Sequence, residues 1–82
     1  MKLNILFFAS VKEALDSSSE IFDGDVKTVN DLIEQLSTRG NNWRTTLQQD
    51  SILVAVNQTV SDVNTQLNDG DEIAFFPPVT GG

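Results

Sequence analysis

Residues 2–9 are rich in β-favouring side chains, and the odd-numbered positions among them are all apolar. In a strand, Leu3, Ile5 and Phe7 would point to the same face, so the segment predicts a strand with one face in the core. Ser10 and Glu13 then stand at the spacing of a capping box, with apolar residues following at helical spacing. We therefore expect a short helix to start at Ser10 and to end in the polar run 16–19.

The next segments predict a weak strand and one well-formed helix. The strand covers residues 19–22, and the turn 23–25 follows it, where Gly24 permits a positive φ. Thr28 and Asp31 again have capping-box spacing. Four apolar residues follow at the i, i+3, i+4 and i+7 positions of an amphipathic helix, namely Val29, Leu32, Ile33 and Leu36. Gly40 is placed to end this helix.

The second half of the chain predicts a helical turn and two further strands. Trp43 and Leu47 are four residues apart, which places both side chains on one side of a helical turn, packed against the core. Residues 52–57 and 72–76 predict strands, with turns at 57–59 and 68–71. The whole order favours an α+β roll in which a mixed sheet packs on one main helix. The strand order does not follow from this pattern.

The end of the sequence predicts an extended tail, residues 77–82, behind a single domain of residues 1–76. Pro77 and Pro78 have no backbone N–H for a sheet ladder and hold the chain extended. Gly81 and Gly82 have no side chains, so the final carboxyl group is sterically open. A Gly-Gly ending alone is also typical of flexible termini without function. Its position directly behind an apolar strand and two prolines favours a functional tail.

Composition excludes several function classes. The chain has no Cys and no His, which removes thiolate nucleophiles, imidazole bases, disulfides and most zinc sites. A stand-alone hydrolase or metalloenzyme is therefore not expected. The net charge of −7 disfavours nucleic acid and anionic membranes as partners and leaves a basic protein partner open beside plain solvation of the acidic residues. The first apolar run is too short to span a membrane and lacks a cleavage pattern, so we expect a cytoplasmic protein.

The two Phe-Phe pairs must each place one ring on either side of the sheet. Phe7 and Phe75 share a parity with the core positions, whereas Phe8 and Phe76 face outward. Two interpretations remain for the outward pair. Other loops of this chain cover the rings, or the rings form a patch on which a partner docks.

Three stretches of the sequence resemble the small subunit of molybdopterin synthase, the MoaD family. The clearest is the run 69–82, DGDEIAFFPPVTGG, which resembles the family's C-terminus nearly residue for residue. The other two are residues 5–9 with 11–13, and residues 54–59, whereas residues 16–50 match in pattern only. The resemblance implies a ubiquitin-like β-grasp fold, in agreement with the roll expected from the element order.

The resemblance also implies a sulfur-carrying cycle. An E1-like activating enzyme would use ATP to adenylate Gly82, which would then receive sulfur as a thiocarboxylate. The tail would enter the active site of the large synthase subunit and donate sulfur to cyclic pyranopterin monophosphate, forming the dithiolene of molybdopterin. The chain would be no enzyme on its own, because the large subunit supplies the catalytic side chains. It would hold no stable cofactor or metal, in a heterotetramer of two small and two large subunits.

The same resemblance assigns roles to residues of the docking patch and the tail. The positions matching Phe8, Val60 and Phe76 lie at a contact that the large subunit and the activating enzyme share. The tail residues that would enter the partner are Pro77, Pro78, Val79, Thr80, Gly81 and Gly82. Two other functions stay open: a sulfur carrier of the thiazole-synthesis type, and a ubiquitin-like modifier that is joined to target lysines.

Overall fold

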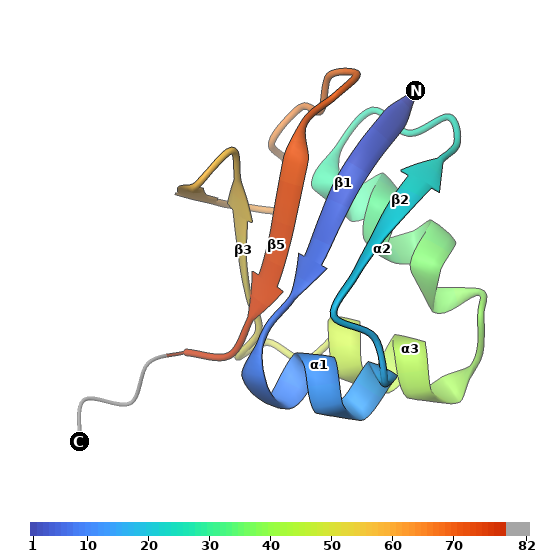
Figure 1. Cartoon of the computed structure of the whole chain (residues 1–82), viewed down its shortest axis with the longest axis vertical. Helices are drawn as coiled ribbons and strands as arrows, with labels where there is room; N and C mark the ends of the chain where they lie inside the picture. Colours follow the sequence, from blue (N-terminus) through green and yellow to red (C-terminus); the bar gives the residue numbers. More distant parts are fainter. Residues whose placement is uncertain (79–82) are drawn as a thin grey trace.

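A computed structural model describes residues 1–78 and shows a five-stranded mixed sheet with three helices (Figure 1). The strands lie in the order β2-β1-β5-β3-β4, and only β1 and β5 pair in parallel. The elements are β1 (Lys2–Phe7), α1 (Ala9–Leu15), β2 (Ser19–Asp23), α2 (Val29–Ser37), α3 (Asn41–Leu47), β3 (Leu53–Val56), β4 (Thr59–Ser61) and β5 (Glu72–Phe76). This arrangement confirms the expected α+β roll.

The core lies between the sheet and α2, where the alternation of each strand directs one parity inward. Leu3, Ile5 and Phe7 of β1 are almost fully buried, as are Ile73 and Phe75 of β5. The rings of Phe7 and Phe75 stack at 6.1 Å between centroids, because these residues are direct partners in the parallel β1–β5 pair. Burying each such ring contributes about 1.5–3 kcal/mol. The predicted core pair is therefore confirmed.

Helix α2 begins at the predicted capping box. The Thr28 hydroxyl accepts from the backbone N–H of Asp31 at 3.2 Å, and the Asp31 carboxylate accepts from the Thr28 N–H at 3.2 Å. Its four predicted apolar positions are all buried: Val29, Leu32, Ile33 and Leu36. The helix ends at Ser37, where the N–H groups of Thr38 and Arg39 bond back to carbonyls of the last turn.

The predicted start of α1 is wrong. Ser10 lies inside the helix and caps nothing, so the Ser10–Glu13 capping box does not form; Phe8 is the N-cap residue. The cause is a contact made far away in the sequence. The Phe8 N–H donates to the Phe75 carbonyl at 3.1 Å, which extends Phe8 along β5, and the chain then turns at Ala9 with φ 51°. Asp16, with φ 52°, ends the helix in the predicted polar run.

Two glycines have roles other than those predicted. Gly24 does not use a positive φ; instead it lies against the ring of Phe22, where an added Cβ would come within 2.7 Å of ring carbons. Gly40, with φ 149°, stands two residues beyond the C-cap of α2 and is the N-cap residue of α3. It therefore joins the two helices rather than ending the first.

Strand β4 was not predicted, although the turn before it was. Asn57 and Gln58 both have positive φ, 51° and 70°, which joins β3 to β4 by a tight hairpin turn. The Asn57 side chain donates to the Asp71 carboxylate and accepts from the Glu72 N–H, each at 3.0 Å. The turn is thus fastened to the start of β5.

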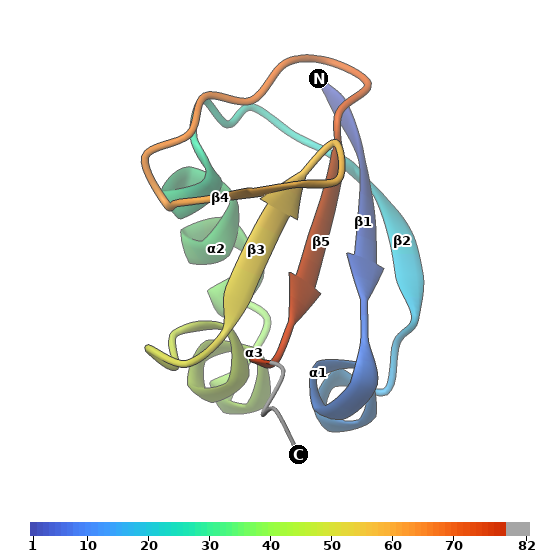
Figure 2. The same ribbon diagram turned by 90° about the vertical axis from the view of Figure 1, so that its left-hand side faces the viewer.

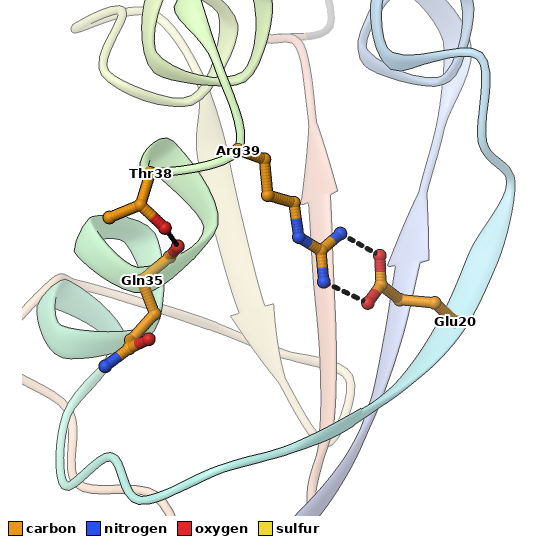
Figure 3. A network of polar contacts seen from close by, with 4 residues as sticks. All are labelled: Glu20, Gln35, Thr38 and Arg39. Atoms are coloured by element: carbon orange, nitrogen blue, oxygen red, sulfur yellow. Dashed lines mark hydrogen bonds and ion pairs between the residues drawn. The ribbon is translucent and has the colours of Figure 1, made fainter.

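Arg39 joins strand β2 to the connection between α2 and α3 (Figure 3). Its guanidinium donates two hydrogen bonds to the Glu20 carboxylate, at 2.6 and 2.7 Å, and lies 4.5 Å from the ring centroid of Trp43. Trp43 meets Phe7 edge-on at 5.7 Å, so its packing against the core is confirmed. The hydrogen bond with Glu20 raises the pKa of Arg39 above its ordinary value. We call Glu20, Arg39 and Trp43 the β2 clamp.

Candidate docking face

Helices α2 and α3 lie on one face of the sheet, where their apolar residues join the core (Figures 1 and 2), and no helix of residues 1–78 covers the other face. The register of the strands places four residues in a row across this open face: Leu6, Ala74, Ala55 and Val60. A second row next to it pairs Phe76 with Leu53. All of these side chains are hydrocarbon. The open face thus carries a continuous apolar strip near the C-terminal end of β5.

Phe8 and Phe76 come together at this end of the sheet. Because Phe7 pairs with Phe75 and the Phe8 N–H bonds to the Phe75 carbonyl, Phe8 lies one strand spacing, about 4.8 Å, from β5. Phe8 is 48 % exposed and Phe76 is half-buried. Residues 1–78 thus leave about half of Phe8 accessible and cover more of Phe76, so both interpretations of the outward pair stay predictions.

Val60 lies on the same face, two strands away from β5. It is the direct partner of Ala55, which is the partner of Ala74, so its Cα stands about 10 Å from β5. Its side chain is 67 % exposed. A valine with this exposure contributes little to the core, so it is available to a partner. The three residues of the predicted contact thus share one face.

The structure adds residues to this contact that were not singled out from the sequence. Leu53, with 36 % exposure, lies beside Phe76, and Ala55 and Ala74, each only 8 % exposed, lie between Val60 and β1. A signal was present: if Ile52, Val54 and Val56 face the core, then Leu53 and Ala55 must face outward. We define the docking face as Leu6, Phe8, Leu53, Ala55, Val60, Ala74 and Phe76.

The docking face can bind but has no group for acid–base or nucleophilic chemistry, since its side chains are all hydrocarbon. Polar residues limit it toward the other end of the sheet, where Asn4 pairs with Glu72. Among residues 1–78, no group of three His, Cys, Asp or Glu side chains is placed to hold a metal ion. In that same part of the chain, no helix is long and apolar enough to cross a membrane.

The predicted tail is described only at its start. Pro77 is half-buried and Pro78 is exposed, directly after Phe76 of β5. Val79, Thr80, Gly81 and Gly82 lie outside the described residues, so their predicted roles stay predictions. The point where the tail leaves the sheet is nevertheless placed, because Phe76 belongs to the docking face. A partner that covers this face also reaches the first residues of the tail.

Comparison of the sequence with known proteins gives matches over nearly its whole length. A model of the ThiS family matches residues 5–82. The molybdopterin synthase sulfur carrier subunit of Haemophilus influenzae is 41 % identical over 80 residues, which cover 98 % of this chain and 99 % of that protein. The protein of the same name from Escherichia coli is 40 % identical, with the same coverage.

Solved structures show the same fold. SAMP1 from Haloferax volcanii superposes with a TM-score of 0.80 and 27 % identity, covering 100 % of both chains. A chain in the complex of subunits 1 and 2 of molybdopterin-converting factor from Helicobacter pylori superposes with a TM-score of 0.71 and 25 % identity, again covering 100 % of both chains. The ubiquitin-like β-grasp fold implied by the sequence resemblance is confirmed.

Proposed function

Because this chain belongs to the ThiS family, we propose that it is the sulfur carrier subunit of a molybdopterin synthase. One observation carries the proposal: about two residues in five are identical to carriers of that name, with no part of either chain left over beyond a few residues. The open docking face at the root of the tail supports it, because a carrier must present its terminus to other proteins.

The proposed chemistry takes place at the carboxyl group of Gly82. A carboxylate is a poor acyl donor, so an activating enzyme first joins it to the α-phosphate of ATP and releases pyrophosphate. A sulfur nucleophile then attacks the acyl carbon; the C–S bond forms and AMP leaves. The product is a thiocarboxylate, which carries sulfur without any Cys in the chain. No cofactor held by this chain takes part.

In this cycle, two partner proteins would bind the docking face one after the other. The large synthase subunit and an E1-like activating enzyme would both cover Phe8, Val60 and Phe76, so that they bind one after the other and not together. The residues that follow Phe76 would then enter the partner's active site: Pro77, Pro78, Val79, Thr80, Gly81 and Gly82. A protein complex of subunits 1 and 2 is known for the Helicobacter pylori factor. For this chain we propose a heterotetramer of two small and two large subunits.

The catalytic side chains of the synthase would belong to the large subunit. This division of labour agrees with the absence of Cys and His from the chain and with the hydrocarbon character of the docking face. The sulfur would pass to cyclic pyranopterin monophosphate and produce the dithiolene of molybdopterin. The small subunit would return to the activating enzyme with an ordinary carboxylate.

A reconstituted reaction tests the proposal. The chain is incubated with an E1-like activating enzyme, ATP and sulfide, and its intact mass is then measured. We expect a gain of about 16 Da, the replacement of one oxygen by sulfur. Addition of purified large subunit and cyclic pyranopterin monophosphate should restore the original mass and yield molybdopterin. Dithiolene formation by a variant that lacks Gly81 and Gly82 would contradict the proposal.

A ubiquitin-like modifier is the second candidate, favoured by the full-length superposition on SAMP1, a small archaeal modifier protein. Both functions begin with the same adenylation, so activation does not separate them. The fate of the acyl group does. In cell extract, covalent conjugates of this chain with other proteins would indicate a modifier, whereas the free thiocarboxylate indicates a carrier. Transfer of sulfur to a thiazole precursor, with no transfer to cyclic pyranopterin monophosphate, would indicate the remaining candidate, a sulfur carrier of the thiazole-synthesis type.

A further inference from the structure

Strand β2 forms a free edge of the sheet, on the side away from β5 (Figure 1). Its one partner among residues 1–78 is β1, with which it pairs in antiparallel register over Ser19–Asp23. The opposite edge, β4, has only three residues. The β2 edge is thus the longer of the two at which another strand can be added.

The free backbone groups of this edge can be identified from the bonds that flank it. The Ser18 carbonyl accepts from the Phe7 N–H at 2.9 Å, and the Gly24 N–H donates to the Met1 carbonyl at 3.1 Å. Both bonds point toward β1, so residues of even number on β2 face β1. The N–H and C=O groups of Ser19, Ile21 and Asp23 therefore point away from the sheet.

Ile21 stands at the middle of this edge and is 70 % exposed, the most exposed of the large apolar side chains among residues 1–78. Its side chain lies on the open face of the sheet, as the partner of Asn4. A shallow hollow of about 320 Å³ adjoins it, and its lining includes half-buried Leu6 beside the polar residues Asn4 and Glu72. An apolar side chain of an added strand would cover Ile21 from this face.

The other face of the edge lies toward helix α2. A hollow of about 320 Å³ lies between α2 and the residues that follow β2, and it is lined by Asp25, Val26, Asp31, Glu34, Gln35 and Thr38. Figure 3 shows the Arg39–Glu20 pair between α2 and β2. Asp25 and Glu34 contribute carboxylates to the lining of the hollow, whereas the Asp31 carboxylate is engaged with the N–H groups of Lys27 and Thr28, and Arg39 is engaged with Glu20. The adjacent cation in the sequence, Lys27, does not line the hollow.

The two faces together specify the chemistry of an occupant. Successive side chains of an extended segment point to opposite faces of a sheet, so alternate residues would lie on the side of Ile21 and on the side of Asp25 and Glu34. Apolar residues fit the first position and lysine or arginine the second. A second copy of this chain fits badly, because each copy carries a net charge of −7 and the two would repel.

We propose that the free edge of β2 is a docking site for an extended segment of a partner protein in which apolar and basic side chains alternate. The segment adds to the sheet beside Ser19, Ile21 and Asp23. This site lies across β1 from β5 and shares no residue with the docking face except Leu6, which lines the hollow beside Ile21. Binding at this site does not require the sulfur chemistry of the tail, so its test does not depend on the proposed function.

A titration followed by nuclear magnetic resonance tests the site. A short synthetic peptide of alternating valine and lysine is added to the ¹⁵N-labelled chain, with an alternating valine and glutamate peptide as the charge control. We expect the amide signals of Ser19, Ile21, Asp23 and Glu34 to move with the lysine peptide and those of β4 to stay. Equal binding of the glutamate peptide, or shifts centred on Val60 and Phe76, would overturn the proposal.

Two variants of Ile21 make the test specific. Ile21→Pro removes an N–H that points away from β1, so the sheet keeps its pairing while the edge loses a donor and its apolar side chain. We expect the Kd for the lysine peptide to rise about tenfold or more. Ile21→Asp should give the same loss without any backbone change, and Val60→Asp should leave the Kd unchanged. An unchanged Kd in both Ile21 variants, or a dimer that depends on Ile21, would refute the site.

Discussion

At the residue scale, Phe7 and Phe8 show how one step along a strand separates stability from recognition. The Phe7 ring is 2 % exposed and stacks on Phe75, whereas the Phe8 ring is 48 % exposed on the other side of the sheet. The first contributes the full transfer energy of a buried ring, whereas about half of the surface of the second still meets solvent. The residues of β3 and β5 alternate in the same way between the core and the docking face.

Val60 gives the cleanest test of the docking face. With 67 % exposure, Val60→Asp should change the free energy of unfolding by less than about 0.5 kcal/mol. It should weaken binding to the large synthase subunit about tenfold or more, because a charge would be buried against apolar surface. Titration calorimetry measures the Kd for the large subunit, and urea denaturation measures the free energy of unfolding. Ile21→Asp is the matched control: equally exposed, on the same sheet face, and expected to leave this binding intact.

Arg39 gives a test of the β2 clamp. Arg39→Ala should lower the free energy of unfolding by about 0.5–1 kcal/mol, the range of a partly exposed ion pair with two hydrogen bonds. It should also shift the fluorescence of Trp43, the single tryptophan, because the cation leaves its ring face. Arg44→Ala is the control, since Arg44 makes no ion pair within residues 1–78. An unaltered emission spectrum in Arg39→Ala would show that the stacking does not persist in solution.

The clamp should be insensitive to alkaline pH. The hydrogen bond with Glu20 raises the pKa of Arg39 above its ordinary value, so its stabilising effect is fully present below the unfolded pKa and is lost only as pH rises through the folded pKa. The difference in unfolding free energy between the native chain and Arg39→Ala should therefore stay constant from about pH 7 to pH 9. A difference that disappears within this range would assign the effect to another group.

At the scale of elements, the hairpin turn between β3 and β4 carries local strain that can be relieved. Gln58 has φ 70°, a conformation that glycine adopts at no cost, so Gln58→Gly should raise the free energy of unfolding by about 0.5–1 kcal/mol. Asn57→Gly should not give this gain, because it deletes the side-chain bonds to Asp71 and Glu72. Urea denaturation of both variants decides; equal gains would mean that the Asn57 bonds do not matter.

The same scale separates what sequence could predict from what it could not. Helix α2 was predictable because its capping box and its apolar stripe lie within one segment. The start of α1 was not, because the Phe75 carbonyl, far along the chain, decides the conformation of Phe8. Strand β4 has only three residues, too few for an alternating pattern to be recognised. The strand order also depends on pairing between residues far apart in the sequence, so the local spacing of apolar residues does not predict it.

For the candidate site, alternation along each strand was enough to predict that Phe8 and Phe76 face outward. It was not enough to show that they are neighbours, since that depends on the parallel pairing of β1 with β5. Leu53 and Ala55 were missed although the same alternation applied to them. The tail residues Val79 to Gly82 carry the proposed chemistry and lie outside the described residues, so only their attachment to Phe76 rests on the structure.

At the scale of the whole molecule, the net charge of −7 should act on the rate of association. If the large subunit or the activating enzyme presents a basic surface, attraction speeds their encounter with this chain, and added salt screens it. We expect the association rate constant to fall about tenfold between low and high ionic strength, with a smaller change in the dissociation rate. Stopped-flow mixing at several salt concentrations measures both. A flat dependence would remove electrostatic steering.

The parallel contact between β1 and β5 joins the earliest and the latest strands to be synthesised. Until residues 72–76 have left the ribosome, Phe7 has no Phe75 to stack on and Phe8 has no neighbour with which to form a surface. The docking face therefore cannot form in a chain that lacks residues 72–76. An intact docking face is thus a sign that the first and last strands of the sheet have already paired.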